Sequence, residues 1–268
     1  MSQAIPDITA ALLAGQLTTE AIGRSLLALD STESTNLTAA ELAPVSNHGL
    51  VVVADHQTGG RGRNGRAWFS PPQRNLYFSI LLKPPCTPAI VPQLSIVAAL
   101  SMHAALLSLL PKLPVAVKWP NDIWIDGRKA CGILCTMSTI GGATEYAVLG
   151  LGLNINTTLE ELPPELHDIA TSLCIATGQP CDRCHVLATF LNTFEQDYTQ
   201  WLAAGSLEPF MQRWNHASLL DGHPVTAEHG HDTIAGTARG ITPEGQLQLE
   251  TNGTITLISA GDVARLRI

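Results

Sequence analysis

The sequence predicts an α+β fold, in which a mixed β-sheet with helices packed on it is followed by a small all-β barrel. Two apolar runs, Leu50–Ala54 and Leu76–Leu82, are typical of buried strands. Residues 84–111 contain no charged side chain, which favours a long core helix over Pro92–Leu110. After Leu220 the chain changes to short strands between glycine-rich turns, a pattern typical of a small barrel.

The first predicted domain covers residues 1–218. It begins with a helix or a helix pair over residues 7–28, interrupted near Gly15. The strands and the core helix named above follow, and a proline-containing loop near residue 163 precedes the last helices. Beyond the core helix we expect strands at Val115–Lys118, Asp122–Ile125, Arg128–Met137 and Ala147–Asn156, and helices over residues 182–203 and 206–217.

Two of these strands form a predicted hairpin. Its turn is the Asp-Gly pair at residues 126–127, which is the preferred pair of a two-residue type I′ turn. In that register Ile125 faces Arg128, and Trp124 faces Lys129. Lys129 is therefore expected to project from the start of the return strand, on the face opposite Ile125.

The second predicted domain covers residues 219–268 and is the small barrel. Its strands are separated by glycine-rich turns, as in small all-β units. We expect five of them, over residues 224–228, 233–240, 246–251, 254–258 and 263–267.

Composition limits the class of protein. The chain has 268 residues, 45% hydrophobic and 14% charged, which is enough for a substantial core. Its net charge of −8 argues against binding to a nucleic-acid duplex, so we expect no DNA partner. Six cysteines and an N-terminus without a basic, apolar leader predict a cytoplasmic protein. The uncharged segment 84–111 contains polar residues and prolines, so we expect no membrane span.

Positive charge is concentrated in one part of this acidic chain. Seven of the fifteen lysines and arginines lie between Asp55 and Asp122, and no acidic residue lies between those two. A local basic segment in an acidic protein favours a small anionic ligand, because the remaining surface would repel a long polyanion.

The sequence GRGRNGRAW at residues 60–68 is the first candidate site. Closely spaced glycines let backbone N–H groups converge on one anion, and Arg61, Arg63 and Arg66 add groups that bind phosphate or carboxylate. No Gly-Lys-Ser/Thr follows, and the spacing differs from the GxGxxG of dinucleotide folds. The alternative is an exposed basic loop that holds no ligand.

The hairpin region is the second candidate. Lys118 and Lys129 flank a Trp-Pro-Asn-Asp corner at residues 119–122, where two cations could hold an anion beside a flat ring. An ordinary hairpin with an exposed lysine at its end is the alternative.

The third candidate is the run GLGLNIN at residues 150–156. Gly150 and Gly152 share one strand face with Asn154, so that face lacks two side chains. Glycine within a strand often marks the close approach of a ligand or of another backbone.

These segments together resemble the biotin protein ligases. Upstream residues Ser34-Thr35-Asn36 and Gln57 also fit that family, and order and intervals agree from about residue 30 to the C-terminus. The resemblance extends to the terminal barrel, which it implies is SH3-like. The family's motifs match residues 60–68, the Lys-Trp-Pro-Asn-Asp corner Lys118–Asp122, the Gly-Arg-Lys-x-x-Gly-Ile-Leu stretch Gly127–Leu134, and the glycine-rich strand Gly150–Asn154.

The resemblance implies an ATP-dependent ligase that forms biotinyl-5′-adenylate and pyrophosphate. It then transfers biotin to a lysine of a biotin carboxyl carrier, a subunit of acetyl-CoA carboxylase. The implied catalytic residues are Lys129, Arg63 and Arg61. The implied biotin-binding residues are Ser34, Thr35, Asn36, Gln57, Arg61, Gly62, Arg63, Lys129 and Gly132, and the implied ATP-binding residues are Arg66, Trp68, Lys118, Asn121 and Asn154.

Mg²⁺ is expected with ATP because the phosphate charge must be neutralised, and no protein side chain is assigned to hold it. The family's bifunctional members carry an N-terminal DNA-binding domain, whereas about 30 residues precede Ser34 here, so we expect a monofunctional ligase. Two alternatives stay open: a lipoate or octanoate ligase or transferase of the same superfamily, and a non-enzymatic nucleic-acid-binding module. A homodimer is also left open.

Overall fold

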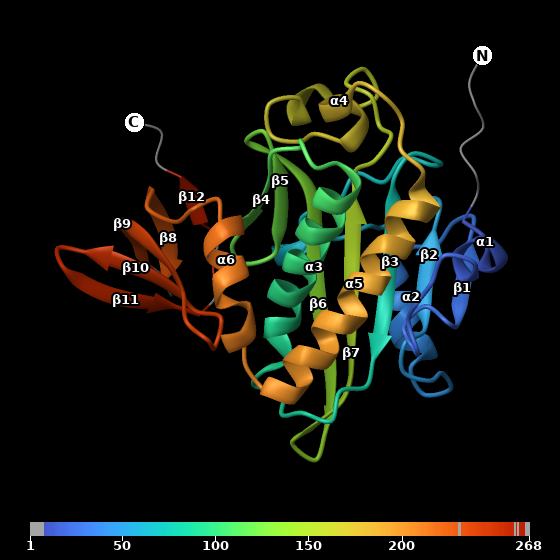
Figure 1. Cartoon of the computed structure of the whole chain (residues 1–268), viewed down its shortest axis with the longest axis horizontal. Helices are drawn as coiled ribbons and strands as arrows, with labels where there is room; N and C mark the ends of the chain where they lie inside the picture. Colours follow the sequence, from blue (N-terminus) through green and yellow to red (C-terminus); the bar gives the residue numbers. More distant parts are fainter. Residues whose placement is uncertain (1–7, 230–231, 260, 262, 266–268) are drawn as a thin grey trace.

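The computed structural model describes residues 8–229, 232–259, 261 and 263–265. The described chain forms a seven-stranded mixed sheet and a separate five-stranded antiparallel sheet (Figure 1). In the first sheet the strand order is β1-β2-β3-β7-β6-β5-β4; β1 and β2 run parallel and the other neighbours antiparallel. The predicted α+β class is therefore confirmed.

The first sheet and its helices account for most of the chain. Its strands are β1 (Leu26–Leu29), β2 (Val51–Ala54), β3 (Leu76–Leu82), β4 (Val115–Lys118), β5 (Asp122–Ile125), β6 (Arg128–Ile140) and β7 (Ala143–Leu153). The α-helices are α1 (Ala10–Ala14), α2 (Thr35–Leu42), α3 (Leu94–Leu109), α4 (Leu173–Thr177), α5 (Arg183–Ala204) and α6 (Met211–Ala217). Single 3-10 turns lie at Arg63–Gly65, Val91–Gln93, Pro164–Leu166 and Glu208–Phe210.

The two faces of the first sheet are covered differently. Helices α3 and α5 pack on one face (Figure 1). They enclose the main hydrophobic core, which includes Phe78 and Ile80 of β3. Helix α2 packs on part of the other face, over a smaller cluster that includes Val52 and Leu81. Because side chains alternate along β3, Ser79 points to the α2 face. The rest of that face is left for the site described below.

The predicted hairpin between β5 and β6 is confirmed. Ile125 pairs with Arg128, and Trp124 pairs with Lys129. A bulge follows, because Ile123 pairs with Cys131 and leaves one residue of β6 without a partner. Ile125 is fully buried in the core.

The helix predicted over residues 7–28 is wrong for most of its length. Helix α1 covers Ala10–Ala14 alone, and Leu26–Leu29 forms strand β1 instead, parallel to β2. Side chains of α5 bind the backbone in between: Asn192 Oδ1 accepts from the N–H of residue 18, and the Glu195 carboxylate accepts from the N–H groups of residues 20–22. Those N–H groups are therefore not available for helical hydrogen bonds.

Other boundaries differ less. The predicted strand Ala147–Asn156 begins earlier and ends at Leu153, because the backbone N–H at Ile155 bonds the side chain of Asn75 rather than a neighbouring strand. The last predicted helix begins at Met211, after a 3-10 turn. Helices α2 and α4 were not predicted at all.

Helix α3 is a core helix. Residues Val91–Leu109 are long and apolar enough to cross a membrane, but 67% of the apolar window is buried within the protein. Burial against α5 and the sheet explains the uncharged sequence of this segment without a bilayer.

The five C-terminal strands are present. They are β8 (Pro224–His229), β9 (Asp232–Ile241), β10 (Leu247–Thr251), β11 (Thr254–Ile258) and β12 (Val263–Arg265), in the order β11-β10-β9-β8-β12. Residues 266 and 267 of the last predicted strand lie outside the described residues. The unit lies beside β4, β5 and α6, at the left of Figure 1.

Candidate active site

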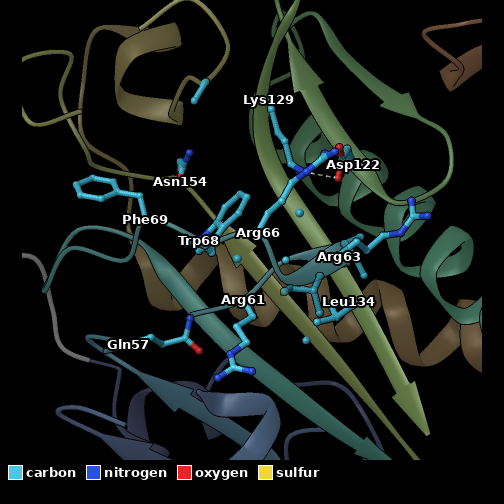
Figure 2. A pocket seen from close by; sticks show the side chains of 18 of the residues that line it. Gln57, Arg61, Arg63, Arg66, Trp68, Phe69, Asp122, Lys129, Leu134 and Asn154 are labelled. Carbon is cyan, nitrogen blue, oxygen red and sulfur yellow. Dashed lines mark ion pairs between the residues drawn. The ribbon is translucent and has the colours of Figure 1, made fainter. Parts of the chain in front are cut away.

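A pocket of about 360 Å³ opens on the face of the first sheet opposite α3 and α5. Every site residue expected from the sequence lines it, except Lys118. The side chains labelled in Figure 2 come from β5, β6, the loop before β3 and the residue after β7, and residues 34–36 at the start of α2 complete the lining. Residues brought together here are Ser34, Thr35, Asn36, Gln57, Arg61, Gly62, Arg63, Arg66, Trp68, Asn121, Lys129, Gly132 and Asn154.

One end of the pocket is built from amides and hydroxyls. Gln57 Oε1 accepts from the backbone N–H of Thr35 at 2.9 Å and lies 3.2 Å from Thr35 Oγ1. The Asn36 amide donates through Nδ2 to the carbonyl of Leu134 at 3.3 Å. Ser34 is the residue before α2, but its side chain makes no capping hydrogen bond, so the hydroxyl can serve a ligand.

The floor of the pocket is glycine. A Cβ at Gly150 would lie 1.8 Å from Asn36 Oδ1, and a Cβ at Gly152 would lie 2.5 Å from Trp68 Nε1. Both distances are impossible for real atoms, so these two positions must be glycine for Asn36 and Trp68 to lie where they do. The predicted glycine face of β7 is thereby confirmed, and its close neighbours are side chains of the pocket.

The loop at residues 60–68 curls back on itself. The N–H of Gly62 donates to the carbonyl of Arg66 at 2.7 Å, and the N–H of Trp68 donates to the carbonyl of Gly60 at 2.9 Å. A Cβ at Gly60 would lie 2.8 Å from Ser70 Oγ, so a larger residue there would displace the Ser70 hydroxyl. The turn displays its arginines toward the pocket while its backbone is held by its own hydrogen bonds.

Lys129 lies at the cationic end of the pocket. Its Nζ is 2.7 Å from Asp122 Oδ1 and 5.4 Å from the ring centre of Trp68 (Figure 2). The lysine stem passes over Gly132, where a Cβ would come within 3.3 Å of Nζ. With three arginines nearby, the lining carries more positive than negative charge, which favours an anionic ligand.

Arg63 connects this site to the C-terminal sheet. One of its nitrogens donates to Asn121 Oδ1 at 3.3 Å, and another donates to the carbonyl of Gly261 at 3.2 Å. Trp119 makes a second connection, because its ring nitrogen donates to the carbonyl of Gly245 at 3.0 Å.

Lys118 lies away from the main pocket. It lines a second cavity of about 390 Å³ between the corner at residues 119–122 and the C-terminal sheet, and its Nζ is 4.5 Å from the ring centre of Trp124. Arg63, Arg66 and Asn121 line both cavities, so the second continues from the first. The structure therefore places the two lysines of the predicted corner in different but adjoining cavities.

Residues 157–171, here called the covering segment, form one wall of the pocket. Leu162, Leu166 and Ile169 line it, and Ile169 is 54% exposed. The segment pairs with the start of β6: the N–H of Lys129 donates to the carbonyl of Ile169, and the N–H of Thr171 donates to that of Lys129, both at 2.9 Å. Sequence reasoning placed a loop here without assigning it to the site, although its apolar residues recur every three or four positions.

Asn75 supports Asn154 from behind. It is fully buried; its Oδ1 accepts from the N–H of Ile155 at 2.8 Å and from Thr157 Oγ1 at 3.0 Å, and its Nδ2 lies 3.5 Å from Asn154 Oδ1. The Asn75 carbonyl accepts from Arg183, which pairs with Asp55 at 2.7 Å. Sequence reasoning missed this residue, because nothing local marks an asparagine before a strand as a partner of position 154.

The donors available to a metal ion are few. Asp122 is the one carboxylate among the described residues that line the main pocket, and the described chain contains no group of three or more His, Cys, Asp or Glu that could hold a metal. One carboxylate is too few to hold a metal ion by protein ligands alone. A single carboxylate does match a Mg²⁺ ion whose other ligands are substrate phosphates and water.

Comparisons with known proteins match both parts of the chain. Residues 28–154 match the biotin/lipoate A/B protein ligase family, and residues 222–266 match the biotin protein ligase C-terminal domain. The biotin--[acetyl-CoA-carboxylase] ligase of Mycobacterium tuberculosis is 33% identical over 250 residues, which are 91% of this chain and 90% of that protein. The chain belongs to the biotin protein ligase family.

Other members are similar at the same level. The bifunctional ligase/repressor BirA of Bacillus subtilis is 37% identical over 92% of this chain and 76% of its own length. The biotin protein ligase of Aquifex aeolicus, solved in complex with biotin and ATP, superposes with a TM-score of 0.78 at 30% identity, covering 91% of this chain and 100% of that one. This chain is therefore similar to biotin protein ligases in both sequence and fold.

Proposed function

We propose that this chain is a biotin--[acetyl-CoA-carboxylase] ligase. One observation carries the proposal: a single glycine-floored pocket joins an end built from amides and hydroxyls to an end built from cations. A ligand that is polar but uncharged at one end and a carboxylate at the other matches this arrangement. Biotin has that form, since its ureido ring lies at one end and its carboxylate at the other.

The ureido ring would bind at the amide end. Its oxygen and N–H groups must be paired once buried, and Ser34, Thr35, Asn36 and Gln57 supply both donors and acceptors there. The biotin carboxylate would then point along Gly150 and Gly152 toward Lys129 and the glycine-arginine loop.

The cationic end would perform the first step. The biotin carboxylate attacks the α-phosphorus of ATP, which forms the acyl–phosphate bond of biotinyl-5′-adenylate and breaks the bond to pyrophosphate. Lys129, Arg61 and Arg63 would stabilise the negative charge that develops at phosphorus. In the second step the acceptor lysine amine attacks the acyl carbon, AMP leaves, and the amine loses a proton to form the amide.

The nucleotide would lie beside biotin. Trp68 and Asn154 would hold adenine or ribose, with the covering segment forming an apolar wall, and Arg66, Asn121 and Lys118 would hold phosphates. Gly62 and Gly132 would allow the adenylate to approach the backbone closely. Lys118 has access to this ligand through the second cavity, which adjoins the first at Arg66 and Asn121.

Mg²⁺ would arrive with ATP. Asp122 and the Asn121 amide are oxygen donors of the kind that Mg²⁺ prefers, and the phosphates and water would supply the remaining ligands. The ion neutralises phosphate charge when bound. Asp122 would then exchange its contact with Lys129 for one with the ion, which leaves the lysine for the substrate.

A lipoate or octanoate ligase or transferase is the nearest alternative. Neither lipoate nor octanoate has a hydrogen-bonding group at the end distant from its carboxylate. The amide and hydroxyl groups at that end of the pocket would then gain no hydrogen bond from the ligand, which disfavours such a substrate. A nucleic-acid-binding module is disfavoured by the net charge of −8 and by the concave form of the site.

The acceptor would be a biotin carboxyl carrier domain, whose biotinylated lysine must reach the carboxylate end of the pocket. A ligase for such a carrier would act in the cytoplasm, where ATP and acetyl-CoA carboxylase occur.

A thermal-shift comparison tests the choice of substrate. Biotin with MgATP should raise the melting temperature by more than lipoate or octanoate with MgATP, because a ligand that binds only the folded protein stabilises it. A larger shift with lipoate or octanoate would contradict the proposal in favour of the superfamily alternative.

A further inference from the structure

Ser79 lies under the amide end of the pocket. It pairs with Gly150 across β3 and β7, and Gly150 pairs with Leu134 across β7 and β6. These three residues therefore form a row across the sheet on the pocket face. Ser79 is fully buried, and Asn36 lies over the glycine in the middle of the row.

The Ser79 hydroxyl contacts two ligand-binding candidates at once. Its Oγ is 2.5 Å from Asn36 Oδ1 and 2.8 Å from Thr35 Oγ1. The orientation of the Asn36 amide is fixed, because its Nδ2 must donate to the Leu134 carbonyl. Asn36 Oδ1 can therefore only accept, and in the free pocket Ser79 is the hydroxyl that donates to it.

The hydroxyl protons of Ser79 and Thr35 are too few to place a hydrogen bond in every oxygen–oxygen contact at this end of the pocket. Thr35 Oγ1 also lies 3.2 Å from Gln57 Oε1, which can only accept because Gln57 Nε2 faces Ser70 Oγ at 3.4 Å. Three oxygen–oxygen contacts, namely Asn36–Ser79, Ser79–Thr35 and Thr35–Gln57, share two protons. One contact is always without a hydrogen bond.

A ligand N–H removes this shortage. If an N–H donates to Asn36 Oδ1, the Ser79 proton is free to turn to Thr35 Oγ1, and the Thr35 proton can serve Gln57 Oε1. A ligand that offers a C–H group or an oxygen at the same place supplies no proton, so one of the three contacts stays without a hydrogen bond.

We propose that Ser79 is a positioning residue that makes this pocket selective for a ring N–H. It holds the Asn36 and Thr35 oxygens where a ligand N–H completes their hydrogen bonds, and it does not itself touch the ligand. This inference rests on the proposed function, because it assigns one ureido N–H of biotin to Asn36 Oδ1.

The test compares biotin with two analogues in which one or the other ring N–H is replaced by oxygen. Their dissociation constants are measured by calorimetry for the wild-type protein and for Ser79→Ala. We expect Ser79→Ala to weaken biotin binding about tenfold, because the Asn36 and Thr35 oxygens lose the group that holds them in place, and to change the affinity for ATP less than twofold. For the analogue that lacks the N–H facing Asn36, the effect of Ser79→Ala should fall below threefold.

Ser101→Ala is the matched control. Ser101 is also fully buried, and its hydroxyl also lies within hydrogen-bond distance of two oxygens, the Val97 carbonyl at 2.9 Å and Asp197 Oδ2 at 2.7 Å. It lies in α3, on the other face of the sheet. It should lower the melting temperature without changing biotin affinity. Ser79→Cys, with a weaker donor of similar size, replaces Ser79→Ala in the comparison if the alanine variant does not fold.

The outcomes separate the two proposals. Suppose that the wild-type protein binds biotin. If Ser79→Ala then leaves this affinity unchanged, or lowers the affinity for biotin and for both analogues by the same factor, the role of Ser79 is overturned while the proposed function stands. A wild-type protein that binds no biotin would overturn both. Selective loss for ligands that carry the facing N–H would establish the role.

Discussion

Lys129 Nζ lies 2.7 Å from Asp122 Oδ1, in a pocket where Asp122 is the one carboxylate among the described lining residues. Both side chains are partly accessible, at 31% and 18% of their surface, so a ligand can reach them. The lysine is therefore held at the cationic end before any substrate binds, and a phosphate or carboxylate that enters has to compete with Asp122 for it.

The first prediction concerns this lysine. Lys129→Ala should lower the rate of biotin-dependent pyrophosphate release about 100-fold or more, because a fixed cation next to developing charge is lost. The melting temperature should change little, since the side chain is partly exposed and lies outside the core. Near-normal pyrophosphate release by a folded Lys129→Ala protein would remove this residue from the reaction.

The second prediction concerns the bond between Arg63 and Gly261. Arg63→Gly removes both the contact to Asn121 and the contact to the C-terminal sheet, so the loop over the adenylate should open more readily. The adenylate should then escape and label lysines of a bystander protein such as serum albumin several-fold more than the wild type does. Arg239→Gly is a suitable control, because Arg239 pairs with Glu250 within the C-terminal sheet. Equal bystander labelling by both variants and the wild type would contradict this role of Arg63.

The third prediction concerns the glycine floor. Gly152→Ala introduces a Cβ 2.5 Å from Trp68 Nε1 and must displace that ring. If Trp68 holds the nucleotide, the KM for ATP should rise about tenfold, whereas the dissociation constant for biotin alone should change much less. Gly142→Ala is the control for a glycine-to-alanine change outside the pocket, because no atom lies within 4 Å of a Cβ there. Its positive φ adds some backbone strain but no contact with a site residue. A change in biotin affinity with an unchanged KM for ATP would reverse the assignment of the two ends.

The fourth prediction concerns stability. The Glu195 carboxylate accepts backbone hydrogen bonds at 2.5, 2.8 and 2.7 Å from residues 20–22. Glu195→Gln keeps the shape but loses the charge and half of the acceptors, so the free energy of unfolding should fall by about 1–3 kcal/mol. Urea denaturation measures this value, and Glu41→Gln, at an exposed position of α2, should leave it within about 0.5 kcal/mol of the wild type.

The fifth prediction concerns pH. His103 on α3 is half-buried, and burial, aided by the nearby charge of Arg213, lowers its pKa below the ordinary value of 6.5. The unfolded chain therefore binds a proton more readily, so the His103 contribution is complete above about pH 6.5 and is lost as the pH falls through the lowered value. Between about pH 7.5 and pH 5.5 the wild-type melting temperature should fall more than that of His103→Gln. Parallel curves would show that His103 does not contribute.

The features predictable from sequence were those that local rules determine. The Asp-Gly turn at residues 126–127 specified the register that pairs Trp124 with Lys129, and the alternation of β7 specified the glycine face. Within the described residues, the positions of the C-terminal strands followed from the turns between them for the same reason.

The predictions that were wrong or missing concern features that depend on residues distant in the sequence. The backbone at residues 18–22 is not helical, because Asn192 and Glu195 of α5 bind its N–H groups, and the local sequence does not reveal these distant partners. Helix α2 has almost no amphipathic pattern, so periodicity did not predict it. Asn75 and Ser79 support the pocket from within strands or next to them, and their partners lie 43 to 82 residues away.

Transfer of biotin to an acceptor lysine tests the central claim most directly. The purified protein is incubated with biotin, MgATP and a biotin carboxyl carrier fragment, and the intact mass of the fragment is recorded by mass spectrometry. We predict that the fragment gains the mass of one biotinyl group, that the gain requires ATP, and that a fragment with the acceptor lysine replaced by arginine gains nothing. An unmodified fragment and no biotin-dependent pyrophosphate release would contradict the assignment of this pocket to biotin activation.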